Sequence, residues 1–389
     1  MSLIPQSIIR DRWLRTLSGL THGTLFFTGP DGREIVHEGA LAGPKAHFVV
    51  HDWNVLQRAA SRGDIGLAED YIAGKCETDD VETLIAYFLR NFDDVEDYAN
   101  GSFLNRLFFS LRNSVLRRNS LRGSKRNIEA HYDVGNDFYR LWLDETMTYS
   151  SALFRTDEDT LCGAQHNKYD RILSRLGNAG DNLLEIGCGW GGFAEEASRS
   201  GRSVTGLTIS PAQYAFASER LSDKADIRLE DYRETSGRFD AVVSIEMFEA
   251  VGQRYWPQYF SVLAERLRAG GRAIVQTITI RDELFDGYSK RSDFIRHYVF
   301  PGGLLPSLAR FKEEASRAGF RVADVFTFGE HYARTLREWS GRLRASEGDI
   351  LALGRDRAFL RNWEFYLGMC AAAFAVGRTD VAQIELLHA

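Results

Sequence analysis

Residues 183–193 read Leu-Leu-Glu-Ile-Gly-Cys-Gly-Trp-Gly-Gly-Phe, and this stretch decides the fold. An apolar run containing Glu185 leads into glycines at Gly187, Gly189 and Gly191, and a helix-like segment follows. A strand that turns into a helix through glycines brings backbone N–H groups close to a ligand. The stretch is therefore typical of the first loop of a nucleotide-binding α/β sheet.

The spacing of these glycines distinguishes two kinds of nucleotide. It is G-x-G-x-G, whereas dinucleotide-binding loops carry G-x-G-x-x-G. Glu185 stands just before the glycines, where its carboxylate can meet the cationic amino group of a methionine moiety. The pattern favours S-adenosylmethionine (SAM), with Glu185, Gly187, Gly189 and Gly191 in its site. The alternative is a glycine-rich turn without a ligand.

Strand-like and helix-like segments alternate through the rest of this region. The expected strands cover residues 182–187, 203–209, 225–229, 239–245 and 272–280, and the expected helices cover 192–200, 211–222 and 254–268. This alternation predicts a parallel sheet covered on both faces, with ligands at the carboxyl ends of its strands. The predicted fold class is α/β, a Rossmann-like doubly wound sheet of the class I SAM-methyltransferase type, with a smaller N-terminal α+β domain.

Polar side chains at two further strand ends suit SAM. The second strand ends at Thr208, and Gln213 follows one helical turn later, so both can hydrogen-bond a ribose or an amino-acid end. After the third strand, Asp231 offers a carboxylate for the adenine amino group and Tyr232 offers a ring face. A loop or capping acid without a ligand is the alternative for Asp231.

Composition excludes several classes of function. The chain has 389 residues, 44% of them apolar, and a net charge of −6, which is ordinary for a globular protein of two domains. This acidity and the lack of a Pro-Pro motif argue against a nucleic-acid methyltransferase. The four cysteines form no CxxC pair, so no metal is expected and a reducing cytoplasm is favoured. Neither a signal peptide nor a run that could span a bilayer is expected.

We divide the chain into three parts. Residues 1–100 show no catalytic constellation and are expected to form an accessory domain for lipid binding or dimerisation. Residues 101–127 form a basic amphipathic linker, because seven basic and no acidic residues lie between Arg106 and Arg126. Such a segment is typical of a membrane-surface element; a solvated linker packed on a domain is the alternative. Residues 128–389 form the catalytic domain.

Several longer motifs carry a resemblance to a known family. They are HYDVGNDF at 131–138, MTYSSA at 147–152, the glycine loop, IRLEDYR at 227–233, MFEAVG at 247–252 and FPGGLLPS at 300–307. The chain thereby resembles the cyclopropane fatty acid synthases of the full-length bacterial type and their mycolic acid methyltransferase relatives. The resemblance covers almost the whole chain.

This resemblance implies a reaction on unsaturated acyl chains of membrane phospholipid. The alkene attacks the methyl group of SAM, and the carbocation loses a proton from the added methyl to close a cyclopropane ring. In relatives a bound bicarbonate takes this proton. The matching positions here are Ser151, Glu249, Gln276, Ile278 and Tyr332. Positions that match SAM contacts are Tyr149, Ser150, Gly187, Thr208, Gln213, Asp231 and Tyr232.

Two positions depart from the family pattern. Ser151 stands where the family has a cysteine, and Gln276 stands where it has a histidine. Ser151 keeps a backbone N–H for an anion, but Gln276 cannot carry a proton or a positive charge. Cyclopropanation is the first expectation. Methylene or methyl branching is the alternative, because a hydride shift followed by proton loss gives a methylene group that later reduction converts to a methyl.

The chemistry sets further expectations. The site must exclude water and stabilise a cation on aromatic faces, for which Tyr149, Phe248 and Tyr298 are candidates, with core packing as the alternative. The protein is expected in the cytoplasm, peripheral at the inner face of the membrane, without a nucleic-acid partner. Full-length relatives are often dimers, so a homodimer is expected. A lipid-binding protein without activity is a further alternative.

Overall fold

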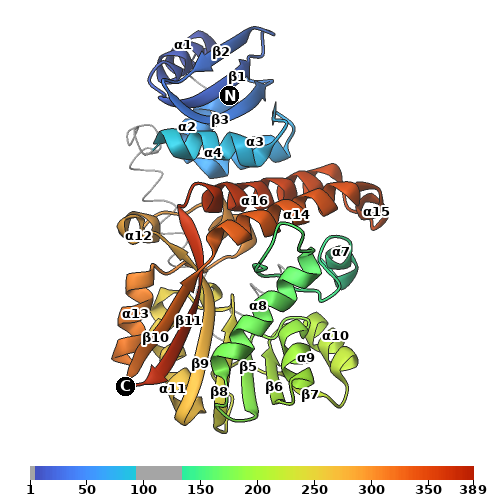
Figure 1. Ribbon diagram of the computed structural model, residues 1–389. Helices are drawn as coiled ribbons and strands as arrows, with labels where there is room; N and C mark the ends of the chain where they lie inside the picture. The colour runs from blue at the N-terminus through green and yellow to red at the C-terminus, as the bar shows by residue number, and fades with distance from the viewer. Residues whose placement is uncertain (1–4, 93–133) are drawn as a thin grey trace.

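The computed structural model describes residues 5–92 and 134–389, which form an N-terminal unit and a larger α/β unit (Figure 1). The predicted basic linker at 101–127 and residues 131–133 of the first family motif lie outside the described residues. Within the described ranges, none of the helices combines the length and apolar character needed to cross a bilayer.

The N-terminal unit is a four-stranded sheet with helices packed against it. Trp13 of the first helix and Phe27 of the first strand pack together in its core, with ring centroids 5.4 Å apart. The strands follow the order β2-β1-β3-β4. The elements are α1 (Gln6–Leu17), β1 (His22–Thr28), β2 (Glu34–Glu38), β3 (Leu41–Val50), α2 (Asn54–Arg62), α3 (Asp64–Ile72), β4 (Cys76–Glu77) and α4 (Val81–Phe92).

The larger unit is built on a seven-stranded sheet of order β10-β11-β9-β8-β5-β6-β7. Each of the five strands predicted from the sequence is present, within a few residues of its expected bounds. The α/β fold class is therefore confirmed. The strands are β5 (Asn182–Ile186), β6 (Ser203–Thr208), β7 (Ala225–Leu229), β8 (Phe239–Ile245), β9 (Leu267–Ile280), β10 (Phe320–Thr327) and β11 (Thr379–His388).

The five predicted strands are parallel as expected, but the sheet has two further strands at one edge that the sequence analysis did not predict. Strands β5 to β9 are parallel, but β11 runs antiparallel to β9 and to β10. The reversal places Gln383 of β11 directly opposite Gln276 of β9. The direction of β11 could not be predicted from the sequence, because its residues 381–386 are all buried and show no alternation.

Helices bury both faces of the sheet, as predicted for a doubly wound fold. Neighbouring strand residues divide between two cores: Leu183 packs on one face and Leu184 on the other. One face is covered by α8 (Leu161–Leu176), α9 (Gly192–Arg199) and α10 (Pro211–Leu221), and the other by α11 (Trp256–Arg266) and α13 (Leu308–Arg317). Shorter helices are α7 (Asn136–Arg140), η1 (Phe248–Ala250), η2 (Gln253–Tyr255), α12 (Asp282–Ser289), η3 (Ile295–Val299) and α15 (Glu347–Ala352).

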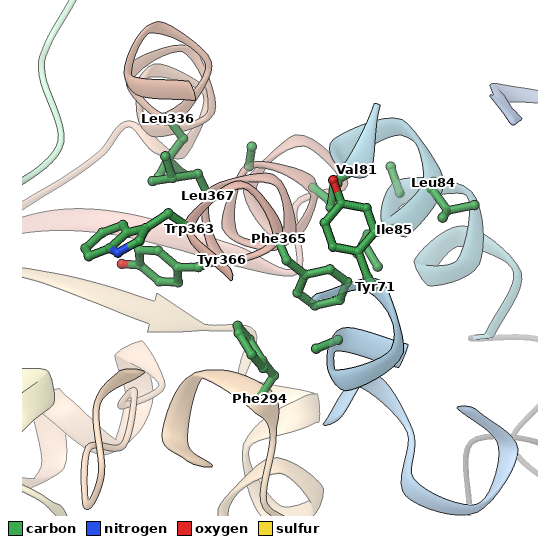
Figure 2. Close-up of a cluster of buried hydrophobic side chains, with 14 of the residues drawn as sticks. Tyr71, Val81, Leu84, Ile85, Phe294, Leu336, Trp363, Phe365, Tyr366 and Leu367 are labelled. Carbon is green, nitrogen blue, oxygen red and sulfur yellow. The ribbon is translucent and has the colours of Figure 1, made fainter. Parts of the chain in front are cut away.

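Two long helices, α14 (Gly329–Ala345) and α16 (Arg357–Ala375), lie between the sheet and the N-terminal unit (Figure 1). Figure 2 shows Phe365 of α16 directed toward Tyr71 of α3, while Leu367 of the same helix lies beside Leu336 of α14. The ring centroid of Phe365 lies 5.7 Å from that of Tyr71 and 5.1 Å from that of Phe294, which it meets edge to face. The Tyr71 hydroxyl also donates to Glu364 at 3.2 Å. The two units therefore share one continuous hydrophobic core.

Candidate active site

The glycine loop between β5 and α9 has the geometry that its sequence predicts. Gly187, Gly189 and Gly191 have φ values of +83°, +54° and +86°, which glycine adopts without strain. A Cβ on Gly192 would lie 2.8 Å from the Tyr169 hydroxyl. The loop therefore packs closely on α8, and its other side faces a cavity.

Glu185 lies at the end of β5 beneath this loop. Its side chain is 2% exposed, and its Oε2 atom has no hydrogen-bond partner among the described residues. Burial raises the pKa of Glu185 to about 8, while the charge of Lys168 opposes the shift. A buried carboxylate oxygen without a donor, beside an open cavity, fits the amino group of a bound SAM.

The other predicted SAM residues also line this cavity. The Thr208 hydroxyl donates to Oε1 of Gln213 at 2.9 Å, so the two side chains are coupled at the end of β6. Asp231 accepts hydrogen bonds from Arg233 on both carboxylate oxygens. Asp231 thus has the structural role of a loop residue that was its alternative interpretation. Its carboxylate oxygens still have lone pairs that can accept from an adenine amino group.

The segment 149–151 is held against the cavity by a buried lysine that the sequence did not reveal. Lys168 of α8 is fully buried and donates to the Ser150 hydroxyl at 2.7 Å and to Gln165 at 2.6 Å. Burial lowers the pKa of Lys168 to about 7, against the carboxylates of Glu246, Asp144 and Glu185. Tyr149 faces the same cavity, and its hydroxyl donates to Tyr366 at 3.1 Å.

Glu249 lies on the turn after β8, as the resemblance suggests for the family glutamate. Its Oε1 atom accepts the backbone N–H of Ile278, and Oε2 has no hydrogen-bond partner within the described part of the chain. Burial raises the pKa of Glu249 to about 8, and the nearby Glu246 carboxylate adds to this shift. Glu249 is therefore mainly protonated near neutral pH.

A cavity of about 1330 Å³ joins these residues to the N-terminal unit. One end is the glycine loop with Glu249 and Tyr332. Apolar side chains from the N-terminal unit form the other end: Trp13, Phe48, Leu56, Ile85, Phe88 and Leu89. The cavity therefore has polar groups around the glycine loop that suit a nucleoside, and apolar side chains from the N-terminal unit that suit a hydrocarbon chain.

Two of the three predicted aromatic candidates are wrong. Phe248 is fully buried in the core beneath the sheet, where its ring packs on Trp256. Tyr298 is 48% exposed and donates to Glu69, away from the cavity wall. The core-packing alternative therefore holds for Phe248. Tyr149 does line the cavity, together with Tyr332 and Tyr366.

Residues 119–384 match the family described as mycolic acid cyclopropane synthetase. Tuberculostearic acid methyltransferase UfaA1 of Mycobacterium tuberculosis is 35% identical over 98% of this chain and 91% of its own. The chain belongs to the mycolic acid cyclopropane synthetase family. It is a SAM-dependent methyltransferase that modifies lipids, and the predicted family and cofactor are confirmed.

Further members of the synthetase family agree with this assignment. A probable fatty acid methyltransferase of Pseudomonas putida is 41% identical over 66% of this chain and 68% of its own. The mycolic acid cyclopropane synthase CmaA1, crystallised with S-adenosylhomocysteine (SAH) and CTAB, superposes with a TM-score of 0.63 at 34% identity. That alignment covers 67% of this chain and 97% of CmaA1.

The predicted bicarbonate of the synthetase family does not fit this site. Glu246, which sequence analysis missed, places its own carboxylate among the expected anion-binding residues. It accepts hydrogen bonds from Ser151 N at 2.8 Å, Gln276 Nε2 at 2.7 Å and Tyr332 Oη at 2.6 Å. A second anion would meet donors already engaged and a like charge. The signal in the sequence was a second glutamate three residues before Glu249.

Proposed function

We propose that this enzyme transfers a one-carbon unit from SAM to the double bond of an unsaturated acyl chain in membrane phospholipid. The supporting observation is the continuity of the cavity from the glycine loop to the apolar wall of the N-terminal unit. An acyl chain in the apolar end would present its double bond beside Glu246, Glu249 and Tyr332. The proposal also gives residues 1–100 a role in holding lipid.

SAM supplies a methyl group made electrophilic by its sulfonium. In this proposal Glu185 and the glycines Gly187, Gly189 and Gly191 hold its methionine end. The side chains that would orient the rest of the molecule are Tyr149, Ser150, Thr208, Gln213, Asp231 and Tyr232. The apolar lining keeps water from a carbocation, and the rings of Tyr149, Tyr332 and Tyr366 would stabilise its charge.

We propose a methylene branch as the product, with a cyclopropane ring as the competing outcome. Both products arise by loss of a proton from the added methyl, so the same active-site base serves either. Relatives named as methyltransferases support the branch: tuberculostearic acid methyltransferase UfaA1 matches 98% of this chain, whereas cyclopropane mycolic acid synthases 3 and 1 match 67% and 66%. The departures at Ser151 and Gln276 support it as well.

For the location, we propose attachment to the cytoplasmic face of the membrane through the basic segment 101–127. Its excess of arginine and lysine would attract anionic headgroups by roughly 1 kcal/mol per cation near the surface. The catalytic domain at 128–389 would then receive the acyl chain from the bilayer below. A homodimer would double the number of basic segments on one membrane surface.

The function is tested with purified protein, SAM and vesicles of a monounsaturated phosphatidylglycerol. Mass spectrometry with fragmentation should locate an added carbon at the former double bond, and proton NMR distinguishes methylene from ring protons. High-field ring protons would assign the cyclopropane outcome instead. Unaltered lipid, with SAM left unconsumed, would refute the function. Vesicles of a saturated phospholipid are the matched control and should stay unchanged.

A further inference from the structure

The end of β8 carries a carboxylate in an unfavourable backbone conformation. Glu246 has a φ of +50°, a left-handed geometry that disfavours any residue with a Cβ. Its backbone N–H donates to the carbonyl oxygen of Gln276 at 2.8 Å, which fixes the turn. Such conformations persist where the surroundings over-determine them, and they concentrate at functional sites.

A chain of side chains fixes the hydrogen-bond donor that faces Glu246. Arg171 of α8 donates to Oε1 of Gln383 at 2.7 Å, and a guanidinium can only donate. Gln383 must therefore turn its amide nitrogen toward Oε1 of Gln276, at 3.0 Å. Gln276 in turn presents its Nε2 to Oε1 of Glu246 at 2.7 Å. The direction of every bond favours a negatively charged Glu246.

The charge of Lys168 also favours the ionised form of Glu246. The titratable and charged groups that face Glu246 are Lys168 on α8, Glu249 on the following turn and Tyr332 on α14. The pKa of Glu246 is raised by burial, and its hydrogen bonds and the charge of Lys168 oppose this rise only in part. Glu246 accepts three hydrogen bonds, whereas Oε2 of Glu249 accepts none from the described residues, so Glu249 rather than Glu246 keeps the proton.

One atom of Glu246 remains available for chemistry. Oε1 accepts both Ser151 N and Gln276 Nε2, whereas Oε2 accepts the Tyr332 hydroxyl. A carboxylate oxygen has two lone-pair positions, so Oε2 keeps one that no described hydrogen bond uses, and Glu246 lines the cavity. The departures at Ser151 and Gln276 are compatible with this arrangement, because it uses only a backbone N–H from the first and an amide from the second.

Building on the proposed function, we infer that the carboxylate of Glu246 is the base that removes the proton from the added methyl. The chain thus carries its own anion where a bound bicarbonate was expected. Gln383 and Arg171 act as positioning residues, since they orient Gln276 without touching the cavity contents.

The step balances without a further reactant. The alkene electron pair forms a bond to the methyl carbon as the carbon–sulfur bond breaks, and sulfur keeps the electrons of that bond. The carbocation then loses a proton from the added methyl to Oε2 of Glu246. The freed C–H electron pair forms either the third bond of a ring or, after a hydride shift, the double bond of a methylene group.

The test compares wild type, Glu246→Gln, Glu246→Gly and the exposed control Glu265→Gln. Turnover is measured on phospholipid vesicles in carbon-dioxide-free buffer, with and without added bicarbonate. Wild type and the control should turn over equally in both buffers. Glu246→Gln should lose about a hundredfold or more in kcat, the contribution of a general base, with KM for SAM unchanged. Glu246→Gly relieves the left-handed strain and should regain turnover with bicarbonate.

A second measurement does not depend on turnover. Carbon-13 NMR of labelled bicarbonate should detect binding to Glu246→Gly and none to wild type. A wild type that binds bicarbonate or needs it for turnover would overturn the inference, as would a Glu246→Gln variant at the wild-type rate. If wild type makes no product from any unsaturated phospholipid, the proposed function fails. The bicarbonate measurement then still decides whether Glu246 fills the anion site.

Discussion

The Tyr332 hydroxyl donates a 2.6 Å hydrogen bond to Oε2 of Glu246, across 86 residues of sequence. This bond joins α14 to the end of β8 at the wall of the cavity. It stabilises the charged form of Glu246 and lowers the pKa of that carboxyl against the effect of burial. The contact therefore links the position of α14 to the chemistry of the site.

Replacing this donor should change both the rate and its pH dependence. Tyr332→Phe removes a hydrogen bond to a charged group, so kcat should fall by about ten- to a hundredfold. The pKa of Glu246 should rise, and the acid limb of the pH–rate profile should move to higher pH. Tyr298→Phe is the matched control, because Tyr298 also donates to a carboxylate at 2.6 Å, away from the cavity. A profile of unchanged shape in Tyr332→Phe would contradict this account.

Glu249→Gln should abolish product while SAM still binds. The substitution removes the proton that Glu249 carries and changes its contact with the Ile278 N–H, but it leaves the glycine loop untouched. We expect a loss of about a hundredfold or more in kcat, with SAM affinity by calorimetry within a factor of about three of wild type. Turnover like that of Glu265→Gln would remove Glu249 from the mechanism.

The same variant should alter how stability depends on pH. The pKa of Glu249 rises from its ordinary value of 4.5 to about 8 on folding. Between these values the folded state alone holds the proton, so stability falls as pH rises. Glu249→Gln lacks this titration, while the other buried groups remain. The difference in Tm between variant and wild type should therefore grow in favour of the variant from about pH 5 to about pH 8. A constant difference would show that Glu249 titrates normally.

Gly192→Ala tests the close packing under the SAM loop. The new Cβ would lie 2.8 Å from the Tyr169 hydroxyl and 2.9 Å from the Thr148 hydroxyl, which themselves form a buried hydrogen bond. We expect a loss of about 1–3 kcal/mol in unfolding free energy and weaker SAM binding. Gly341→Ala is the control, because a Cβ there meets nothing within 4 Å; it should stabilise α14 by up to about 1 kcal/mol. Equal effects in chemical denaturation would argue against the packing.

The membrane role of the basic segment is tested by charge reversal. Replacing Arg112, Arg117 and Arg118 with glutamate changes the local charge without altering any described residue. Binding to anionic vesicles in a sedimentation assay should fall by at least about tenfold at low salt, since each cation near the surface contributes roughly 1 kcal/mol. Binding to zwitterionic vesicles should change little. Equal binding to anionic vesicles would refute the membrane role.

Much of the fold could be predicted from local pattern. The strand before the glycines and the four other expected strands have apolar runs whose length and spacing identify them. The antiparallel β11 was missed because its buried run includes Gln383 and Glu385, whose polarity hides a core strand. Those side chains are satisfied by Arg171 and Arg175 from α8, a contact made across more than two hundred residues of sequence.

The candidate site also contains residues that local sequence predicts and residues that it does not. The glycine loop and the strand ends are local features, so Gly187, Thr208 and Asp231 could be placed from the sequence alone. Glu246 could not, because its partners come from residues 151, 276 and 332, which are brought together only by folding. The signal in the sequence, a second glutamate three residues before Glu249, does not reveal these partners.

The most direct test of the central claim uses SAM with a fully deuterated methyl group. Purified protein, unsaturated phosphatidylglycerol vesicles and this donor should give lipid that carries the new carbon with two of its three deuterium atoms, since one is lost to the active-site base. Mass spectrometry of the released acyl chains reads this directly. Retention of all three deuterium atoms, or acyl chains without any label, would contradict the account.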